Sequence, residues 1–455
     1  MHTLALACLG LMFAGEPPVA KEKSRPLKIE DLYTFARVSD PRISPDGKHV
    51  AYVVTSVDLA ANKSSAAIWL APTSGGSPKA LTTSGKRDSQ PRWSPDGKSI
   101  LFVSNRGGSN QLWLISTTGG EAKQLTTIST GAGDPVWSRD GKRIAFASAV
   151  YPEYSEKPFE KADALNKKRT EEIEKEPVKA RVFSRLFYRH WDSYVEDKRQ
   201  HLFVLSLDGD KAGTPRNVTP GDRDAAPTST TFATGDDFTF SPDGKYLVYT
   251  ATPDRDEAWS TNFDILRVSV EGGKPENLTK DNLAADGGPR FSPDGKKLLY
   301  RAQTKPGAEA DRWQLYVVDC DAGGAFTGKP RSITKDFDTS PESFVWGADG
   351  KSVILTGDQA ARTPVWKADV ASGEVTKLLE GNTNGGLSLS DDGKRLAFTR
   401  VAMHHPHEVF VANLDDDAPE GKNLSKANAK FLATLDMPQP EIGRASCRER
   451  VSIDV

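Results

Sequence analysis

Residues 91–103 read PRWSPDGKSILFV, and variants of this stretch recur along the chain. Its centre is the pentapeptide Ser-Pro-Asp-Gly-Lys, which occurs with small changes at seven places. These places are Ser44 to Lys48, Ser94 to Lys98, Ser138 to Lys142, Ser241 to Lys245, Ser292 to Lys296, Gly347 to Lys351 and Ser390 to Lys394. A short motif that returns at intervals of tens of residues indicates an array of similar structural units.

The residues of the motif are those that a tight hairpin requires. Proline has a fixed φ that suits the second position of a type I turn, and aspartate is at ease in the third. Glycine then takes the positive φ of a three-residue hairpin loop with a bulge. Each copy therefore predicts the tip of a β-hairpin.

The segments around each tip predict four strands per unit. Apolar runs such as Ile100 to Val103 and Leu247 to Tyr249 follow the tip without alternation, so both faces of that strand should be buried. A third apolar segment comes next, for example Leu112 to Leu114, and then a fourth marked by a pair such as Leu125-Thr126. Seven such units over residues 27–437 predict an all-β fold, a seven-bladed β-propeller of four-stranded blades.

The spacing of the tips locates an insertion. Successive tip aspartates are 50, 44, 103, 51, 55 and 43 residues apart, so one interval carries a surplus of about 50 residues. We assign this surplus to an insertion at residues 150–199, within blade three. Its first part, Glu160 to Lys175, is rich in helix-forming and charged residues and predicts an exposed helix. Its second part, Val182 to Tyr194, is aromatic and basic.

The composition excludes several classes of partner. A hydrophobic fraction of 37%, a charged fraction of 27% and a net charge of −2 suit a soluble protein without a nucleic-acid or anionic-membrane surface. We expect no cofactor and no metal. The cluster at His404 to His407 can in principle bind zinc or nickel, but we favour a surface loop, and we favour a hairpin turn over a calcium site at Asp415 to Asp417. Cys320 is the one cysteine away from both chain ends and predicts neither a disulfide nor a zinc site.

Both ends of the chain differ from the repeats. Leu4 to Ala14 form a compact apolar run, too short to span a bilayer, so we assign residues 1–20 to a signal peptide and expect a periplasmic or secreted protein. Residues 441–455 lack any blade pattern, and Glu441 to Val451 resemble the in-frame translation of a sequencing adapter. We interpret them as a non-native tail, in which case the natural protein would continue beyond about Pro440.

Several motifs carry a resemblance to a known family. They are Ile29 to Leu32, the segment Val38 to Gly47, Ser104 to Gly108, and Leu186 to Asp192. With them, residues 27–440 resemble the N-terminal propeller of the prolyl oligopeptidase family of serine peptidases, especially its acylaminoacyl-peptidase and dipeptidyl-peptidase-like branches. The hairpin tips alone are shared with TolB-like and WD40-like propellers.

The resemblance implies a partner domain that the sequence does not contain. In the family an α/β-hydrolase domain follows the propeller and carries a Ser-Asp-His triad, with the serine in a Gly-x-Ser-x-Gly elbow. No such pentapeptide occurs here, since Ser390 occupies the last position of the nearest match at Gly386. We therefore assign no catalytic residue and expect this chain to be inactive by itself. The propeller's implied role is to restrict access of peptides to the hydrolase.

The second part of the insertion holds the candidate substrate-binding residues: Arg189, His190, Trp191 and Asp192. An arginine there can meet a peptide carboxylate or carbonyl, and aromatic rings can pack on its side chains. The alternative is structural, with Phe187, Tyr188 and Trp191 anchoring the insertion to its blade and Arg189 paired with Asp192. Glu153, Glu156 and Glu160 are further candidates for binding a substrate ammonium, although solvated surface glutamates are far commoner.

Two functional hypotheses follow. In the first, the chain is the access-controlling propeller of an exported serine peptidase that hydrolyses short peptides. In the second, it is a free-standing TolB-like periplasmic propeller that serves as a scaffold for protein interactions. The motif at Tyr188 to Asp192 and the adapter-like ending favour the first. The oligomeric state is left open.

Overall fold

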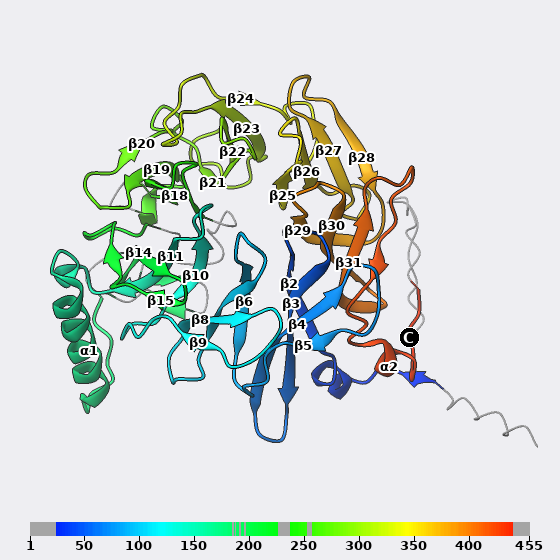
Figure 1. Ribbon diagram of the computed structural model, residues 1–455, viewed down its shortest axis with the longest axis horizontal. Coiled ribbons are helices and arrows are strands. Elements are labelled where there is room, and N and C mark those ends of the chain that lie inside the picture. The colour runs from blue at the N-terminus through cyan, green and yellow to red at the C-terminus, as the bar shows by residue number, and fades with distance from the viewer. Residues whose placement is uncertain are drawn as a thin grey trace, which may run out of the picture.

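The computed structural model describes residues 24–183, 186, 188–190, 193–194, 197–225, 237–252 and 257–439. Within them, seven antiparallel sheets follow one another around a ring, as predicted (Figure 1). The predicted signal peptide at residues 1–20 and the predicted non-native tail at residues 441–455 lie outside the described residues.

The first three blades of the seven include the insertion. Blade 1 consists of β2 (Arg37–Ile43), β3 (His49–Asp58), β4 (Lys63–Pro72) and β5 (Lys79–Ala80). Blade 2 consists of β6 (Asp88–Trp93), β7 (Ser99–Ser104), β8 (Gln111–Ser116) and β9 (Lys123–Gln124). Blade 3 consists of β10 (Gly133–Trp137), β11 (Arg143–Val150), β14 (Arg199–Asp208) and β16 (Arg216–Asn217), with the short β15 (Lys211–Ala212) paired to the end of β14.

The remaining four blades complete the ring. Blade 4 consists of β17 (Phe238–Phe240), β18 (Tyr246–Ala251), β19 (Asp264–Ser269) and β20 (Glu276–Asn277). Blade 5 consists of β21 (Asp286–Phe291), β22 (Lys297–Ala302), β23 (Gln314–Asp319) and β24 (Arg331–Ser332). Blade 6 consists of β25 (Phe344–Trp346), β26 (Ser352–Thr356), β27 (Val365–Asp369) and β28 (Val375–Leu379). Blade 7 consists of β29 (Thr383–Leu389), β30 (Arg395–Ala402), β31 (His405–Asn413) and β32 (Lys422–Asn423).

The core is divided among the interfaces between blades. Each of the seven hydrophobic clusters joins two neighbouring blades, and together they cover all seven interfaces of the ring. In β18, Leu247 and Tyr249 belong to the cluster shared with blade 3, while Val248 belongs to the cluster shared with blade 5. Because successive side chains of a strand point to opposite faces, an unbroken apolar run packs on both neighbours. This confirms the prediction that both faces are buried.

The ring closes without exchanging a strand between its first and last blades. Blade 7 is built only from β29 to β32, and Figure 1 shows it beside the blue strands of blade 1. The two blades share a hydrophobic cluster that includes Tyr52 and Val409, and Ile43 N of blade 1 donates a hydrogen bond to Ser388 Oγ of blade 7 at 3.1 Å. Two reciprocal hydrogen bonds join the segments that flank these blades. Ala36 N donates to Asn428 Oδ1 at 2.8 Å, and Asn428 Nδ2 donates to Ala36 O at 3.0 Å. Outside the blades, β1 (Arg25–Pro26) pairs in parallel with β33 (Leu435–Asp436), which follows the short helix α2 (Ala429–Leu432).

The hairpin tips have the conformation that their sequence predicts. In blade 2, Ser94 Oγ donates to Asp96 Oδ1 at 2.6 Å, Lys98 N donates to the same oxygen at 3.1 Å, and Gly97 has a φ of 69°. These bonds to Ser94 and Lys98 hold the pKa of the Asp96 carboxyl below its usual value. The aspartate thus fixes the turn that joins β6 to β7.

Neighbouring tips also touch one another. A Cβ added to the glycine of a tip would meet the second residue of the preceding tip: 3.7 Å to Pro45 Cδ from Gly97, and 2.9 Å to Ala348 Cβ from Gly393. At Gly295 the corresponding distance to Pro242 Cβ is 2.8 Å. At Gly295 and Gly393 glycine is therefore required twice, once for its positive φ and once for the close approach of the neighbouring tip, whereas the contact at Gly97 is an ordinary one.

Replacing Gly295 by alanine should separate these two requirements when it is compared with Gly85→Ala. Gly85 has a similar φ of +67° against +73° at Gly295, but nothing lies within 4 Å of its added Cβ. We expect Gly85→Ala to lower the free energy of unfolding by about 1 kcal/mol and Gly295→Ala to lower it by about 1–3 kcal/mol more. Urea unfolding measures both values. Equal losses of unfolding free energy in the two variants would show that the close approach of the tips at Gly295 does not add to the cost of the substitution.

Candidate functional site

The two ends of the ring are built from different connections. Within each blade the strands are antiparallel, so the tip between the first two strands lies at the same end as the connection between the third and fourth. The connection between the second and third strands lies at the opposite end, together with the link to the next blade. The insertion of blade 3 joins β11 to β14 and therefore leaves the ring at this opposite end, which we call the insertion end.

The exposed large apolar side chains gather at the insertion end. Among the described residues, each of them lies in a connection between second and third strands or in a segment that precedes the first strand of a blade. They are Leu27, Ile29, Leu32, Tyr33, Leu59, Ile173, Val178, Val182, Phe183, Leu186, Tyr188, Tyr194, Trp259, Leu283 and Met403. Trp259 is 79% exposed and Met403 is 84% exposed. Apolar surface concentrated on one face is typical of a docking surface.

The helical part of the insertion is fixed to blade 3. It consists of a 3-10 helix (Pro152–Tyr154) and of α1 (Phe159–Lys175), which confirms the helix predicted for Glu160 to Lys175. The side chain of Asn166 is buried, and its Oδ1 accepts a hydrogen bond from Tyr151 N at 2.8 Å. Asp163 Oδ1 accepts bonds from Ser129 N at 2.8 Å and Ser129 Oγ at 2.7 Å. Phe159 completes the attachment by packing on Phe203 of the blade core.

A buried polar network forms the root of the insertion. Ser155 Oγ accepts a hydrogen bond from Gly221 N at 3.0 Å, and Ser155 O accepts one from Asn217 Nδ2 at 3.4 Å. Asn217 Nδ2 also donates to His201 Nδ1 at 2.9 Å, so the proton of the neutral imidazole lies on Nε2 and is donated to Gly221 O at 2.9 Å. Burial is the main cause that lowers the pKa of His201 to about 4. The network is therefore complete only while His201 is neutral.

The four candidate substrate-binding residues fall partly outside the described residues. Arg189 and His190 form β12 (Arg189–His190), which pairs with β13 (Ser193–Tyr194) as an antiparallel hairpin. Trp191 and Asp192 lie outside the described residues. Arg189 is exposed and stands opposite Tyr194. The substrate-binding role of these residues stays a prediction.

Aromatic residues around that hairpin pack within the insertion itself. Phe183 stacks on Tyr194 at 5.6 Å between ring centroids and contacts Tyr188 at 5.2 Å. The guanidinium of Arg181 lies 4.4 Å from the centroid of the Tyr194 ring. Tyr188, proposed above as an anchor to the blade, thus packs on a residue of the insertion and is 45% exposed.

One of the three glutamates considered as substrate ligands takes part in an ion pair within the insertion. Glu153 forms an ion pair with Arg169 at 3.6 Å, which occupies one of the candidate ammonium ligands. The stretch His404 to His407 was predicted to be a surface loop, but β31 begins at His405, so that prediction is wrong for His405 and His407. The hairpin partner β30 extends to Ala402 and pairs with His405, which draws these residues into the sheet. Among the described residues there is no group of three or more potential metal-ligating side chains.

The innermost strands carry polar residues that the sequence analysis missed. Asp40, Gln90 and Asp134 each precede a proline and have left-handed φ values of 49°, 53° and 51°. They sit at or beside the irregular register of β2, β6 and β10. A residue other than glycine at positive φ has a strained backbone, and such strain is often found at functional sites, where a side chain has to be held in one orientation. The recurring x-Pro pair that shortly precedes the tip motif was the signal that could have revealed them.

These residues link the first three blades through their side chains. Asp40 accepts hydrogen bonds from Arg42 Nε at 2.8 Å and from Arg92 Nη1 at 2.9 Å, and Arg92 belongs to the next blade. Burial disfavours the charged form of Asp40, but the two guanidinium groups outweigh it and hold the pKa of the carboxyl below its usual value. Gln90 Nε2 donates to Asp134 Oδ1 at 2.6 Å, and Asp134 N donates to Gln90 Oε1 at 2.8 Å. This arrangement offers polar and charged groups for binding.

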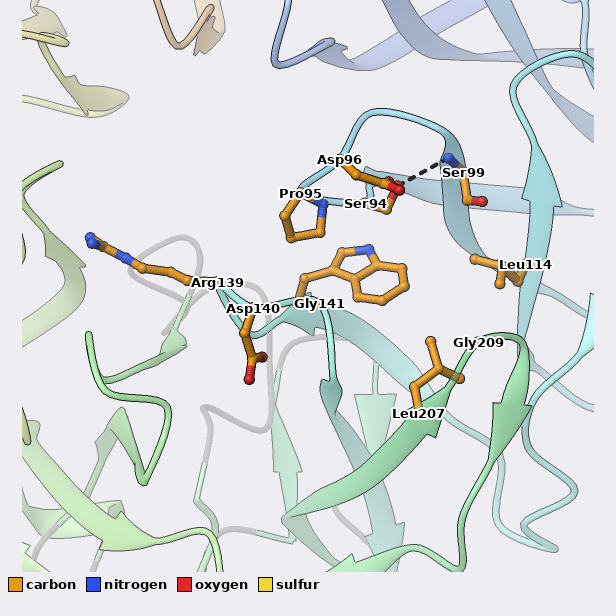
Figure 2. Close-up of a pocket in the computed structure, with 11 residues that line it drawn as sticks. Ser94, Pro95, Asp96, Ser99, Leu114, Arg139, Asp140, Gly141, Leu207 and Gly209 are labelled. Carbon is orange, nitrogen blue, oxygen red and sulfur yellow. Dashed lines mark hydrogen bonds between the residues drawn. The ribbon is translucent and has the colours of Figure 1, made fainter.

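Cavities between the described parts of neighbouring blades include the following two. One of about 450 Å³ opens at the tip end between blades 2 and 3, where Pro95, Leu114 and Leu207 line it together with Asp96 and Asp140 (Figure 2). The other, of about 510 Å³, lies between blades 3 and 4 beside the 219–225 connection, next to Tyr249 and Lys274. In the described part of the chain, no helix is long and apolar enough to cross a membrane.

Comparisons with known proteins show which propellers this ring is similar to. The family model of the TolB beta propeller domain matches residues 31–162. Dipeptidyl-peptidase 5 of Porphyromonas gingivalis is 29% identical over 432 residues, which is 94% of this chain and 59% of that protein. The chain is a TolB-like β-propeller homologous to dipeptidyl-peptidase 5. It spans about three fifths of the length of this curated relative.

Solved structures show the same fold as this TolB-like propeller. The acylaminoacyl peptidase of Pyrococcus horikoshii superposes with a TM-score of 0.64 and 19% identity, over 91% of this chain and 56% of that one. The propeller domain of the Trilobed protease from Pyrococcus furiosus, described as having an open velcro topology, gives a TM-score of 0.57 and 16% identity over 87% of this chain and 97% of that one. The propeller is thus structurally similar to those of peptidases of the prolyl oligopeptidase type.

The root network of the TolB-like propeller should make its stability depend on pH. In the unfolded chain the pKa of His201 has its ordinary value of 6.5, whereas in the folded chain burial lowers this pKa to about 4. Stability is therefore lost as pH falls through this window, by about 3 kcal/mol in the limit. We expect His201→Gln to flatten the dependence of the unfolding free energy on pH.

The exposed His49 supplies the control for this measurement. His49→Gln should leave the slope between neutral pH and about pH 4 as it is in the unchanged protein. A His201→Gln variant with an unchanged slope would contradict the role assigned to the buried imidazole.

Proposed function

We propose that this propeller is the access-controlling domain of an exported serine peptidase that hydrolyses short peptides, and that it acts together with an α/β-hydrolase domain. The homology to dipeptidyl-peptidase 5 supports the peptidase context. The observation that carries the proposal is the gathering of exposed apolar side chains at the insertion end. A surface of this kind is costly to leave in water, and a second domain would cover it.

Access control follows from where such a domain would sit. A hydrolase packed on the insertion end would have its active site covered by the ring, whose inner strands leave only a central channel. Extended or short peptides can pass such an opening, whereas folded proteins are too wide. Specificity would then arise from access as well as from contacts in the active site. The predicted substrate contacts of the insertion remain those of Arg189, His190, Trp191 and Asp192.

The chain by itself should not cleave peptides, because its sequence has no Gly-x-Ser-x-Gly elbow. We expect no hydrolysis of dipeptidyl or acyl-peptide chromogenic substrates and no labelling by a serine-directed phosphonate. The protein encoded by the complete genomic reading frame should show both. Labelling of the 455-residue chain would contradict the assignment. A complete protein that lacks both reactions would instead favour a scaffold that binds other proteins.

The docking surface can be tested separately at Met403, which is 84% exposed in the β30–β31 hairpin. In the isolated chain, Met403→Ser should change the free energy of unfolding by no more than about 0.5 kcal/mol, because so exposed a side chain buries little apolar surface in the folded state. Binding of the dye ANS should decrease. In the complete protein the same substitution should weaken the association of the two domains, which limited proteolysis would detect.

A surface residue at the opposite end provides the comparison. Thr118 is exposed in the connection between β8 and β9, at the tip end. Thr118→Ser should alter neither dye binding nor the resistance of the complete protein to proteolysis. Similar effects of the two substitutions would argue against a docking surface confined to the insertion end.

A further inference from the structure

The second residue of the hairpin tip is small or compact in six of the seven blades. These positions hold Pro45, Pro95, Pro242, Pro293, Ala348 and Asp391. Blade 3 has Arg139 instead, which is longer than any of them and carries a positive charge. A long side chain at this position has to be accommodated where neighbouring tips converge.

The contacts between tips follow one rule at five of the seven junctions and depart from it at two. In blades 1, 2, 4, 5 and 6 the second residue packs toward the glycine of the following tip, as Pro45 does toward Gly97. At the junction of blades 7 and 1, Ser390 lies 3.1 Å from the Cβ that Gly47 would carry. Arg139 should meet Gly244 of blade 4 by the same rule. The neighbour found within 4 Å of that position is Arg143 Nη1, which leaves Arg139 free to extend elsewhere.

Arg139 reaches past blade 4 and binds the tip of blade 5. Its Nη2 donates to Ser292 O at 2.7 Å, and its Nη1 donates to Pro293 O at 3.0 Å. Nη1 also lies 3.5 Å from the Cβ that Gly295 would carry. Figure 2 shows the side chain extended away from the cavity that the neighbouring residues line. One guanidinium therefore joins two blades that are not neighbours in the ring.

The path of this side chain determines what it can do. Blades 3, 4 and 5 are consecutive in the ring, and the blades of a propeller surround a central channel. The direct line from tip 3 to tip 5 therefore runs on the channel side of tip 4. Pro242 of tip 4 packs on Gly295 of tip 5, which places all three tips in one contact group. The planar guanidinium holds two carbonyl groups at once, a geometry that a lysine ammonium does not reproduce.

We propose that Arg139 is a strut across the tip-end mouth of the channel, which fixes the spacing of tips 3, 4 and 5 and restricts the size of peptide that enters there. The restriction on peptides rests on the proposed function, whereas the strut itself rests only on the contacts above. Replacing Arg139 should loosen these tips and widen the opening, without disturbing the blade cores.

Hydrogen exchange of the 455-residue chain tests the strut. In Arg139→Ala, amides of the segment around Gly295 should exchange about fivefold faster, because the two hydrogen bonds to a charged group are gone. Amides around Gly47, on the far side of the ring, should not change. Arg139→Lys should restore only part of the protection. Lys142→Ala removes a positive charge from the same tip and serves as the matched control. Unchanged exchange near Gly295 in Arg139→Ala would overturn the strut.

Peptidase kinetics of the complete protein test the restriction. We expect Arg139→Ala to raise kcat/KM for a long quenched-fluorescence peptide about threefold. The kcat/KM for a dipeptidyl nitroanilide should not change. Lys142→Ala should have the same kcat/KM values as the unchanged protein for both substrates. An unchanged ratio of the two substrates would overturn control of entry by Arg139. Complete lack of peptidase activity in the unchanged protein would overturn the proposed function, and the exchange result would then decide the strut alone.

Discussion

The structure depends on the burial of both faces of the second strand in every blade. Leu247 and Tyr249 of β18 pack toward one neighbouring blade, and Val248 packs toward the other. Full burial of a side chain of this size contributes about 1.5–3 kcal/mol, so an uncovered face would be expensive. A linear stack of blades leaves one such face at each end. Closing the stack into a ring covers both, which explains why blades 1 and 7 meet even though no strand is exchanged between them.

Because the faces of the central strands are buried between blades, they are not accessible to another molecule. Blade faces are occupied by packing, so groups that can meet another molecule lie on the inner strands, on exposed outer strands such as β5 and β9, and at the two ends of the ring. The tip end brings successive tips into contact and carries the cavity between blades 2 and 3. The insertion end carries the apolar side chains, the helix α1 and the cavity beside Tyr249. The two ends of the ring therefore differ in their surface chemistry. A domain that is to cover an active site with one particular end needs such a difference.

The sequence analysis was accurate where structure follows from neighbouring residues. Each tip motif predicts its own turn, and the composition of Glu160 to Lys175 predicts α1 to within one residue. It was wrong for the histidine stretch, where pairing of Ala402 with His405 extends the β30–β31 hairpin and draws His405 and His407 into the sheet. The anchoring role considered for Phe187, Tyr188 and Trp191 stays a prediction, since Phe187 and Trp191 lie outside the described residues. Asp40, Gln90 and Asp134 were missed because their partners lie in other blades or across a strained backbone.

The sequence by itself determined the number of blades, the place of the insertion and the absence of a nucleophile elbow, since all three are local patterns that can be counted. Only the tertiary structure decided which side chains meet. The same tip position holds a proline that packs on the next blade at Pro45 and an arginine that reaches the second blade along at Arg139. The reason is physical: a turn is set by the φ preferences of a few adjacent residues, whereas a contact between blades depends on how the whole ring places them.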